Sequence, residues 1–210
     1  GGDVDVVRPG PAIAFNGTTL TDARSLVVGD AHTCVVAKAG GAVENVYCWG
    51  DDRQGQLGDG AGIASDVVKI ALADSGVIAT VAPLTAGSNQ TCVTNGGPTF
   101  DWRCWGQGVY DGENLLYPVH ASPIMQPLLA TAPGLSIGIN FQCKNMPGSN
   151  DEVQCRGTNM DGQTGRGTLA GSPSPAGFAD VDFVDSTESD PVMSAGTSSH
   201  RCAFFGALSN

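Results

Sequence analysis

Basic residues and long apolar runs are both scarce in this chain, and each scarcity excludes a class of partner or protein. The sequence has 10 lysines and arginines against 21 aspartates and glutamates, which gives a net charge of −11. Nucleic acids and anionic membranes both bind clusters of basic residues, so neither is an expected partner. No apolar run is long enough to span a membrane. The acidity is instead typical of an exported protein that stays in solution.

Apolar residues at helical spacing are also lacking, which argues against a helical fold. The best helical candidates are the short segments Val67–Leu72 and Ile124–Ala132, and Pro127 interrupts the second. Glycine accounts for 30 of the 210 residues, about twice its usual share of about 7%. Short alternating segments such as Cys34–Ala37 and Val46–Trp49 are bounded by Gly, Asn and Asp clusters. The sequence therefore predicts an all-β chain of short strands.

One phrase of residues recurs four times: a small-residue turn, a cysteine, a short gap, and then Cys-Trp-Gly or a variant of it. The first cysteines of the four copies are Cys34, Cys92, Cys143 and Cys202, which lie 58, 51 and 59 residues apart. A period of this size predicts structural repeats that stack on one another or surround an axis. The framework positions of the copies are Gly29, His32, Trp49, Gly50, Gly55 and Gly58; Gly87, Trp105 and Gly106; Gly138, Gly157, Gly162 and Gly165; and Gly196 and His200.

The copies differ at informative places. The second copy lacks the Gly-Gln-Leu-Gly segment of the first and has Gly108 and Gly112 instead. The third has Phe141 at the histidine position and Arg156 at the tryptophan position. The fourth has one extra residue before Cys202.

This phrase resembles the regulator of chromosome condensation repeat in its disulfide-bearing, secreted bacterial form, over about residues 20–205. The resemblance implies a β-propeller of four-stranded blades, most often seven around the axis. We expect an N-terminal lead-in segment at 1–20, blades at 21–76, 77–130 and 131–186, and an incomplete fourth blade at 187–210. About three and a half blades cannot close a ring of seven. The chain is then truncated, or other chains complete it, or it forms a smaller ring of four blades.

Seven cysteines in a chain of this size predict an oxidising compartment. Three pairs of cysteines flank one turn each between predicted antiparallel strands, so opposed residues can form disulfides. Zinc is disfavoured because zinc-binding cysteines usually lie two to four residues apart. The predicted pairs are Cys34–Cys48, Cys92–Cys104 and Cys143–Cys155, which leaves Cys202 unpaired or bound to another chain.

Two local motifs carry possible chemistry, but each has a structural explanation. The segment Gly134–Gly138 matches the nucleophile elbow of serine hydrolases, yet its serine, Ser136, aligns with a framework position of the preceding copy. Asp52 and Asp59 flank a glycine-rich turn without the alternating oxygen ligands of a calcium loop. We expect no cofactor and no metal.

The histidines of the phrase are expected to be structural. His32 and His200 stand two residues before a cysteine, which places them on the cysteine's face of an extended strand. The resemblance implies that this histidine hydrogen-bonds to the backbone near the neighbouring blade. Trp49 and Trp105 point to the opposite face of their strands, where packing between blades is favoured over an aromatic surface that binds a ligand.

No nucleophile, acid–base pair or phosphate loop emerges, so the sequence favours a non-enzymatic scaffold, secreted or at the cell surface, that binds a protein or a glycan. The expected binding surface is formed by aromatic residues near loops, Tyr47, Trp102, Tyr110 and Tyr117. The alternatives are a subunit of an extracellular assembly completed by other chains, a nucleotide exchange factor for a small GTPase, and a secreted enzyme inhibitor.

Overall fold

The fold is taken from a computed structural model that describes the larger part of the chain. It describes residues 13–41, 44–63, 83–94, 100–108, 119–130, 132–146, 153–165, 177–178 and 180–181, and the backbone of the strands at 65–70, 72–73, 76–77, 174–180, 192–193 and 203–204.

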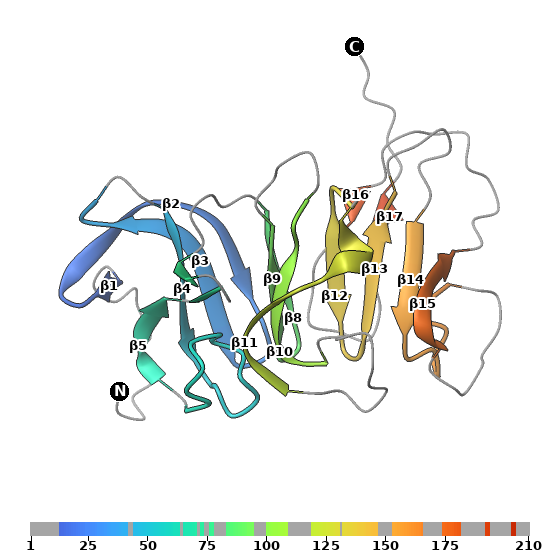
Figure 1. The fold of residues 1–210 in the computed structure, drawn as a ribbon, viewed down its shortest axis with the longest axis horizontal. Helices are drawn as coiled ribbons and strands as arrows, with labels where there is room; N and C mark the ends of the chain where they lie inside the picture. The colour runs from blue at the N-terminus through green and yellow to red at the C-terminus, as the bar shows by residue number, and fades with distance from the viewer. Residues whose placement is uncertain are drawn as a thin grey trace, which may run out of the picture.

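Three antiparallel sheets follow one another along the chain, and each is called a blade here (Figure 1). The first blade contains β1 (Ala14–Phe15), β2 (Thr18–Val28), β3 (His32–Ala39), β4 (Asn45–Gly50) and β5 (Ser65–Ile70). The second contains β8 (Leu84–Gly87), β9 (Gln90–Val93), β10 (Arg103–Gln107) and β11 (Val119–Met125). The third contains β12 (Leu135–Gly138), β13 (Phe141–Asn145), β14 (Val153–Gly157) and β15 (Ser174–Asp180).

Two short hairpins complete the strands: β6 (Leu72–Ala73) with β7 (Gly76–Val77), and β16 (Val192–Met193) with β17 (Ala203–Phe204). The predicted all-β class is confirmed. The first blade begins at Ala14, so its first strand lies within the segment assigned to the lead-in. Among the described residues, no helix has the length and apolar character needed to cross a membrane.

Both helical candidates were wrong. Val67–Leu72 lies in β5 and β6, while Ile124–Ala132 contains the end of β11 and a single 3-10 turn, Pro127–Leu129. The edges of β4 and β10 provide hydrogen-bond partners for β5 and β11, as in the pair Cys104 and Ile124. This strand pairing outweighs the weak local preference for a helix.

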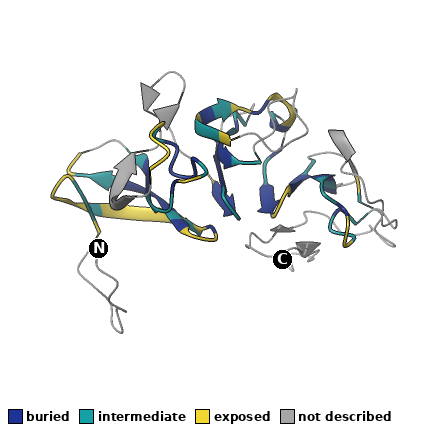
Figure 2. Cartoon of the chain, turned by 90° about the horizontal axis from the view of Figure 1, so that it is seen from below, coloured by how far each residue is buried: buried dark blue, intermediate teal, exposed yellow. Residues whose placement is uncertain are grey.

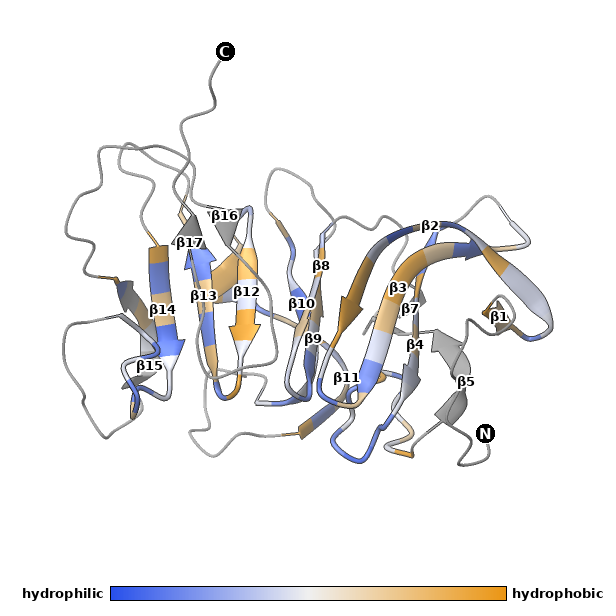
Figure 3. Cartoon of the chain, turned by 180° about the vertical axis from the view of Figure 1, so that it is seen from behind, coloured by the Kyte–Doolittle hydropathy of each residue, from blue (hydrophilic) through white to orange (hydrophobic). Residues whose placement is uncertain are grey.

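The blades lie side by side, with β8 between β2 and β12. Along β13 and β14, polar and apolar residues alternate (Figure 3), because successive side chains of a strand point to opposite faces. Buried residues therefore gather where neighbouring sheets face each other (Figure 2). One cluster joins the first and second blades and includes Cys34, Cys48, Leu84 and Trp105. Another joins the second and third blades and includes Cys92, Cys104, Leu135 and Ile137.

Candidate functional site

A disulfide connects the two central strands of every blade. The bonds are Cys34–Cys48 between β3 and β4, Cys92–Cys104 between β9 and β10, and Cys143–Cys155 between β13 and β14. In each case the two residues stand directly opposite one another in the strand register. These are the three pairs that the spacing predicts, and they indicate an oxidising compartment. Cys202, Gly196 and His200 lie outside the described residues.

The glycine of Cys-Trp-Gly has the same role in all three blades. Gly50, Gly106 and Gly157 have φ angles of 109°, 97° and 109°. A Cβ atom on any of them would lie within 2.5 Å of a backbone carbonyl oxygen in the turn before the first cysteine. The register with the following strand shifts at this point in each blade, because the one residue before the glycine stands opposite three or four residues of that strand, which forms the bulge. Trp49, Trp105 and Arg156 are the residues opposite the bulge.

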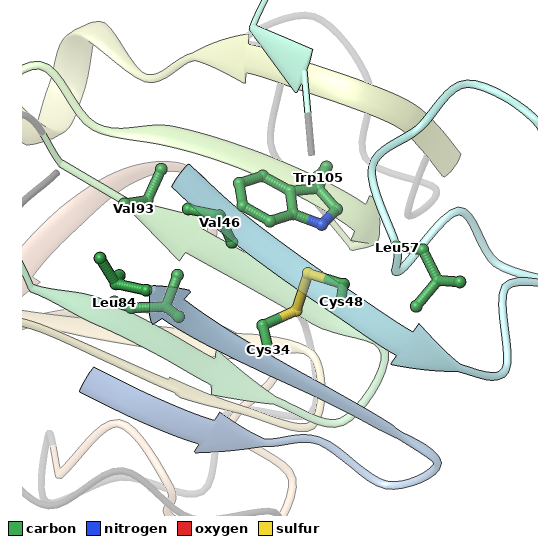
Figure 4. Packing of buried hydrophobic residues seen from close by; sticks show 8 residues of the cluster. Cys34, Val46, Cys48, Leu57, Leu84, Val93 and Trp105 are labelled. Carbon is green, nitrogen blue, oxygen red and sulfur yellow. A yellow bond between two sulfur atoms is a disulfide. The ribbon is translucent and has the colours of Figure 1, made fainter. Parts of the chain in front are cut away.

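Trp105 docks into a socket formed by the Gly-Gln-Leu-Gly loop of the preceding blade. Its indole Nε1 donates a hydrogen bond to the carbonyl oxygen of Gln56 at 2.8 Å. The ring covers the Cys34–Cys48 disulfide and lies near Leu57 (Figure 4). A Cβ atom on Gly58 would lie 2.7 Å from the indole, so only glycine leaves room for it. The tryptophan thus packs blade against blade, as its position predicts.

The loop that forms this socket recurs in the third blade. Asp52 Oδ1 accepts a hydrogen bond from the N–H of Leu57 at 2.7 Å, and Asn159 Oδ1 accepts one from Thr164 at 3.0 Å. Burial raises the pKa of Asp52, with Asp59 adding repulsion. Asp52 therefore stabilises a turn, and among the described residues no group of three His, Cys, Asp or Glu side chains could hold a metal ion.

His32 joins the first blade to the second through a side chain rather than through backbone, which corrects the expectation. Its Nε2 lies 2.7 Å from the hydroxyl oxygen of Thr91. Burial lowers the pKa of His32 to about 4, although the charges of Asp30 and Asp51 oppose the shift. The imidazole is therefore neutral at neutral pH. Gly29 is needed beside it, because a Cβ atom there would lie 2.1 Å from the ring.

At the tryptophan position, the boundary between the second and third blades has a polar network in place of the apolar packing of the first boundary. Arg156 stands at the tryptophan position and donates from Nε and Nη2 to Gln142 Oε1, at 3.1 and 2.7 Å. Its Nη2 also lies 3.3 Å from Gln126 Oε1, and Gln142 donates to Gln90 Oε1 at 2.5 Å. At the first boundary the preceding blade supplies the Gly-Gln-Leu-Gly socket and the following blade supplies the tryptophan. At the second boundary the second copy lacks the socket sequence and the third copy lacks the tryptophan, so both partners of this contact are replaced together.

Two cations share one aromatic ring at this boundary. Lys144 Nζ and Arg156 Cζ each lie 4.5 Å from the centroid of the Phe178 ring. Lys144 also donates to the carbonyl of Leu128 at 2.9 Å. Burial lowers the pKa of Lys144, and the charge of Arg156 lowers it further. These cations hold blades together and are not exposed for an external ligand.

The predicted aromatic binding surface was wrong for its two described members. Tyr47 and Trp102 are only 2% and 1% exposed. Trp102 packs between the second and third blades and donates to the carbonyl of Ala132 at 2.8 Å, while the Tyr47 ring packs against Phe15. Tyr110 and Tyr117 lie outside the described residues.

The remaining framework residues are also internal. Ser136 is 1% exposed, so it is no accessible nucleophile. Gly87 and Gly138 end β8 and β12 and are buried; at Gly138 a Cβ atom would lie 2.1 Å from the Phe141 ring. Gly55 and Gly165 have positive φ angles in the two socket loops, as does Gly162. The sequence did not single out Thr91, Gln142 and Lys144, whose contacts join blades. It also did not single out the exposed Leu26 and Val28 of β2.

Comparison with known proteins agrees with this architecture. Residues 23–56 match the regulator of chromosome condensation (RCC1) repeat family. No curated protein matches the chain significantly in sequence. Human WBSCR16 has a similar structure, with a TM-score of 0.66, 16% identity, and coverage of 93% of this chain and 47% of that one. Prp20p from Saccharomyces cerevisiae has a TM-score of 0.62 and 14% identity, over 83% of this chain and 42% of that one.

The chain thus spans less than half the length of both solved propellers, and at these identities the likeness is one of fold. It carries a repeat of the RCC1 family and has the blade architecture of RCC1-like β-propellers.

Proposed function

We propose that this chain is a non-enzymatic scaffold, secreted or at the cell surface, that binds a protein or a glycan through loops between its strands. The observation that carries the proposal is the presence of one buried disulfide in each of the three blades. Cytosolic thiols are kept reduced, so a fold stabilised by one disulfide per blade favours export to an oxidising environment.

Binding rather than catalysis is favoured by the role of the buried polar groups. His32, Asp52, Lys144 and Arg156 each make contacts that join blades or hold a turn. A rigid scaffold of this kind leaves its loops free to vary and to contact a ligand.

The loops that follow β4 and β14 are the best described candidates for the binding surface. Both leave the blades at the same end of the molecule (Figure 1). The first exposes Ile63, and its Arg53 side chain is 80% exposed beside Asp51. The second exposes Met160 and Asp161. A surface of mixed charge and isolated apolar side chains suits a protein or glycan ligand.

The test is binding of the labelled, disulfide-intact chain to a glycan array and to intact cells that have been treated or not treated with a surface protease. We expect saturable binding to one glycan class or to a protease-sensitive receptor. The variants Arg53→Ala and Ile63→Ala should weaken it, whereas Lys38→Ala, in β3 and outside these loops, should not. Absence of binding in both formats would contradict the proposal.

An intracellular role is the competing outcome. The published description of Prp20p includes its binding to Gsp1p and histones, which is a property of that protein. Accelerated nucleotide release from a small GTPase by this chain, with all cysteines reduced, would favour an exchange factor and would overturn the extracellular proposal.

A further inference from the structure

The first long strand of the first blade extends well beyond its equivalents in the other two blades. β8 and β12 have four residues each and begin at Leu84 and Leu135, which pair with the residue after a first cysteine. Leu26 holds this register position in β2, yet β2 begins at Thr18 and has 11 residues. The repeated blade pattern therefore does not account for the earlier part of β2. This part and β1, residues 13–24, are called the arm here.

Two bulges separate the arm from the rest of β2. The register with β3 shifts between Thr21 and Arg24, and again between Arg24 and Leu26. Asp22 and Ser25 lie one in each shift and have φ angles of 49° and 54°, a conformation that is unfavourable for residues other than glycine. Bulges bend a strand and increase its twist. Accordingly, β2 curves over the first blade on its way from β1 to β8 (Figure 1).

The chain is fastened differently on the two sides of this bend. At the bend, the Ser25 hydroxyl accepts a hydrogen bond from the Leu84 N–H of the second blade at 3.1 Å. In the arm, β1 has only two residues, and the ring of Phe15 packs 5.4 Å from that of Tyr47. Every arm residue within β2 is exposed except Leu20, which is partly buried. Few buried side chains and an exposed backbone are the properties of a segment that opens locally.

The ion pairs of the arm add little to its attachment. Arg24 pairs with Glu44, and Asp22 pairs with Lys38 at 3.0 Å. The arm member of each pair is largely exposed, with side-chain exposures of 57% for Arg24 and 64% for Asp22. Ion pairs in contact with water contribute little to stability. The attachment of the arm therefore depends mainly on its apolar contacts.

The surface beneath the arm is apolar and almost completely covered. Tyr47, Val35 and Ala37 are 2%, 5% and 0% exposed, and Phe15 and Leu20 pack against them. This cluster is separate from the two clusters that join the blades to one another. Loss of the arm contacts would thus uncover the Tyr47 cluster and leave the blade boundaries in place.

We propose that the arm is a strap that opens about the bend at Asp22–Ser25 while the three blades stay folded. In the closed state, Phe15 and Leu20 shield Tyr47 from water. In the open state, the Tyr47 cluster meets solvent and the outer part of β3, around Ala39, loses its partner strand. The strap therefore controls the exposure of this apolar surface.

Native-state hydrogen exchange of the disulfide-intact chain tests this. The Leu20 N–H, which bonds to the Ile13 carbonyl at 2.9 Å, reports on the arm, and the amides of β4 report on the blade. We expect the arm amides to exchange at least about a hundredfold faster than those of β4. Low concentrations of urea should speed exchange in β4 and not in the arm, because opening the arm exposes little surface. Arm amides as protected as β4, with the same dependence on urea, would overturn the proposal.

Two variants separate opening of the arm from unfolding of the blades. Phe15→Ala removes the contact with Tyr47 and should speed exchange in the arm by about tenfold. Gly58→Ala destabilises the tryptophan socket, so it should speed exchange in β4 by at least about tenfold. It should leave the arm unchanged, because the socket stays folded when the arm opens.

Equal acceleration of the arm and of β4 by Gly58→Ala would show that the arm opens only when the blades unfold, and would overturn the proposal. So would arm exchange that Phe15→Ala leaves unchanged. None of these results depends on the ligand or the compartment of the proposed function.

Discussion

His32 Nε2 and Thr91 Oγ1 lie 2.7 Å apart across the boundary between the first and second blades. The threonine hydroxyl also lies 3.9 Å from Cys34 Sγ, so one side chain of the second blade contacts both the histidine and the disulfide of the first. Both His32 and Thr91 are buried. This contact makes the stability of the blade boundary depend on the protonation of one imidazole.

We expect the chain to lose stability between pH 6.5 and pH 4 because of His32. Its pKa is about 4 in the folded chain, against 6.5 when it is unfolded. Between these values the unfolded state binds a proton that the folded state excludes, so the free energy of unfolding falls as the pH falls. The loss from this group approaches about 3 kcal/mol at pH 4. Urea unfolding at pH 7.5 and 4.5 measures it.

The matched variant is His32→Gln, because Gln90 occupies the equivalent position of the second blade. It should show a smaller drop over the same pH interval, with the remainder due to carboxylates. If the free energy of unfolding fell equally in both proteins, groups other than His32 would cause the pH dependence.

Gly58→Ala should destabilise the chain through the tryptophan socket. The new Cβ atom would lie 2.7 Å from the indole of Trp105, at a residue with a φ of 72°. Gly17→Ala is the control, because Gly17 has a φ of 77° and no atom within 4 Å of its Cβ position. The control should lose about 1 kcal/mol in free energy of unfolding from backbone strain alone. Gly58→Ala should lose about 2 kcal/mol more, with a shift in tryptophan fluorescence. Equal losses would mean that the socket does not confine the indole.

Arg156→Ala should destabilise the boundary between the second and third blades by about 2 kcal/mol, because it leaves the buried oxygens of Gln142 and Gln126 without this donor. Arg156→Lys should recover little of that loss, since an ammonium lacks the planar fork that contacts Gln142 twice. Arg53→Ala removes an exposed arginine and should change the thermal unfolding midpoint little. Should Arg156→Ala unfold at the temperature of Arg53→Ala, the polar network would contribute nothing to stability.

Removing one disulfide should weaken the fold without changing it. The Cys92–Cys104 bond joins two residues that are 12 apart in the sequence. Replacing both cysteines by alanine opens the loop that this bond closes. We expect a loss of about 3 kcal/mol in the free energy of unfolding, measured with urea. Far-ultraviolet circular dichroism should remain that of the parent at low denaturant. An unchanged urea midpoint would show that the bond is not formed in the purified chain.

The repeat phrase predicted most of the architecture because its parts have separate physical reasons. Opposed cysteines mark paired strands, and the glycine after the second cysteine marks a positive φ where the following strand bulges. The alternation of side chains along a strand placed Trp105 on the face opposite Cys104, where it packs against the first blade. The helical candidates failed because strand pairing, which is non-local, decided their structure.

The sequence could have excluded Trp102 as a surface residue. It stands two residues before Cys104, and residues two apart in a strand share a face, so both point into the same boundary. The exposure of Leu26 could not be predicted in this way. Leu84 and Leu135, which hold the same register position in the second and third blades, are buried, whereas no other blade among the described residues covers Leu26, and the local pattern does not encode this difference.

Mapping the disulfides of the native chain by mass spectrometry of unreduced peptides tests the central claim most directly. The account predicts linked peptides for Cys34–Cys48, Cys92–Cys104 and Cys143–Cys155, because each bond connects the two central strands of one blade. A bond between cysteines of different blades, or free thiols at these six positions, would contradict both the register of the blades and the oxidising compartment.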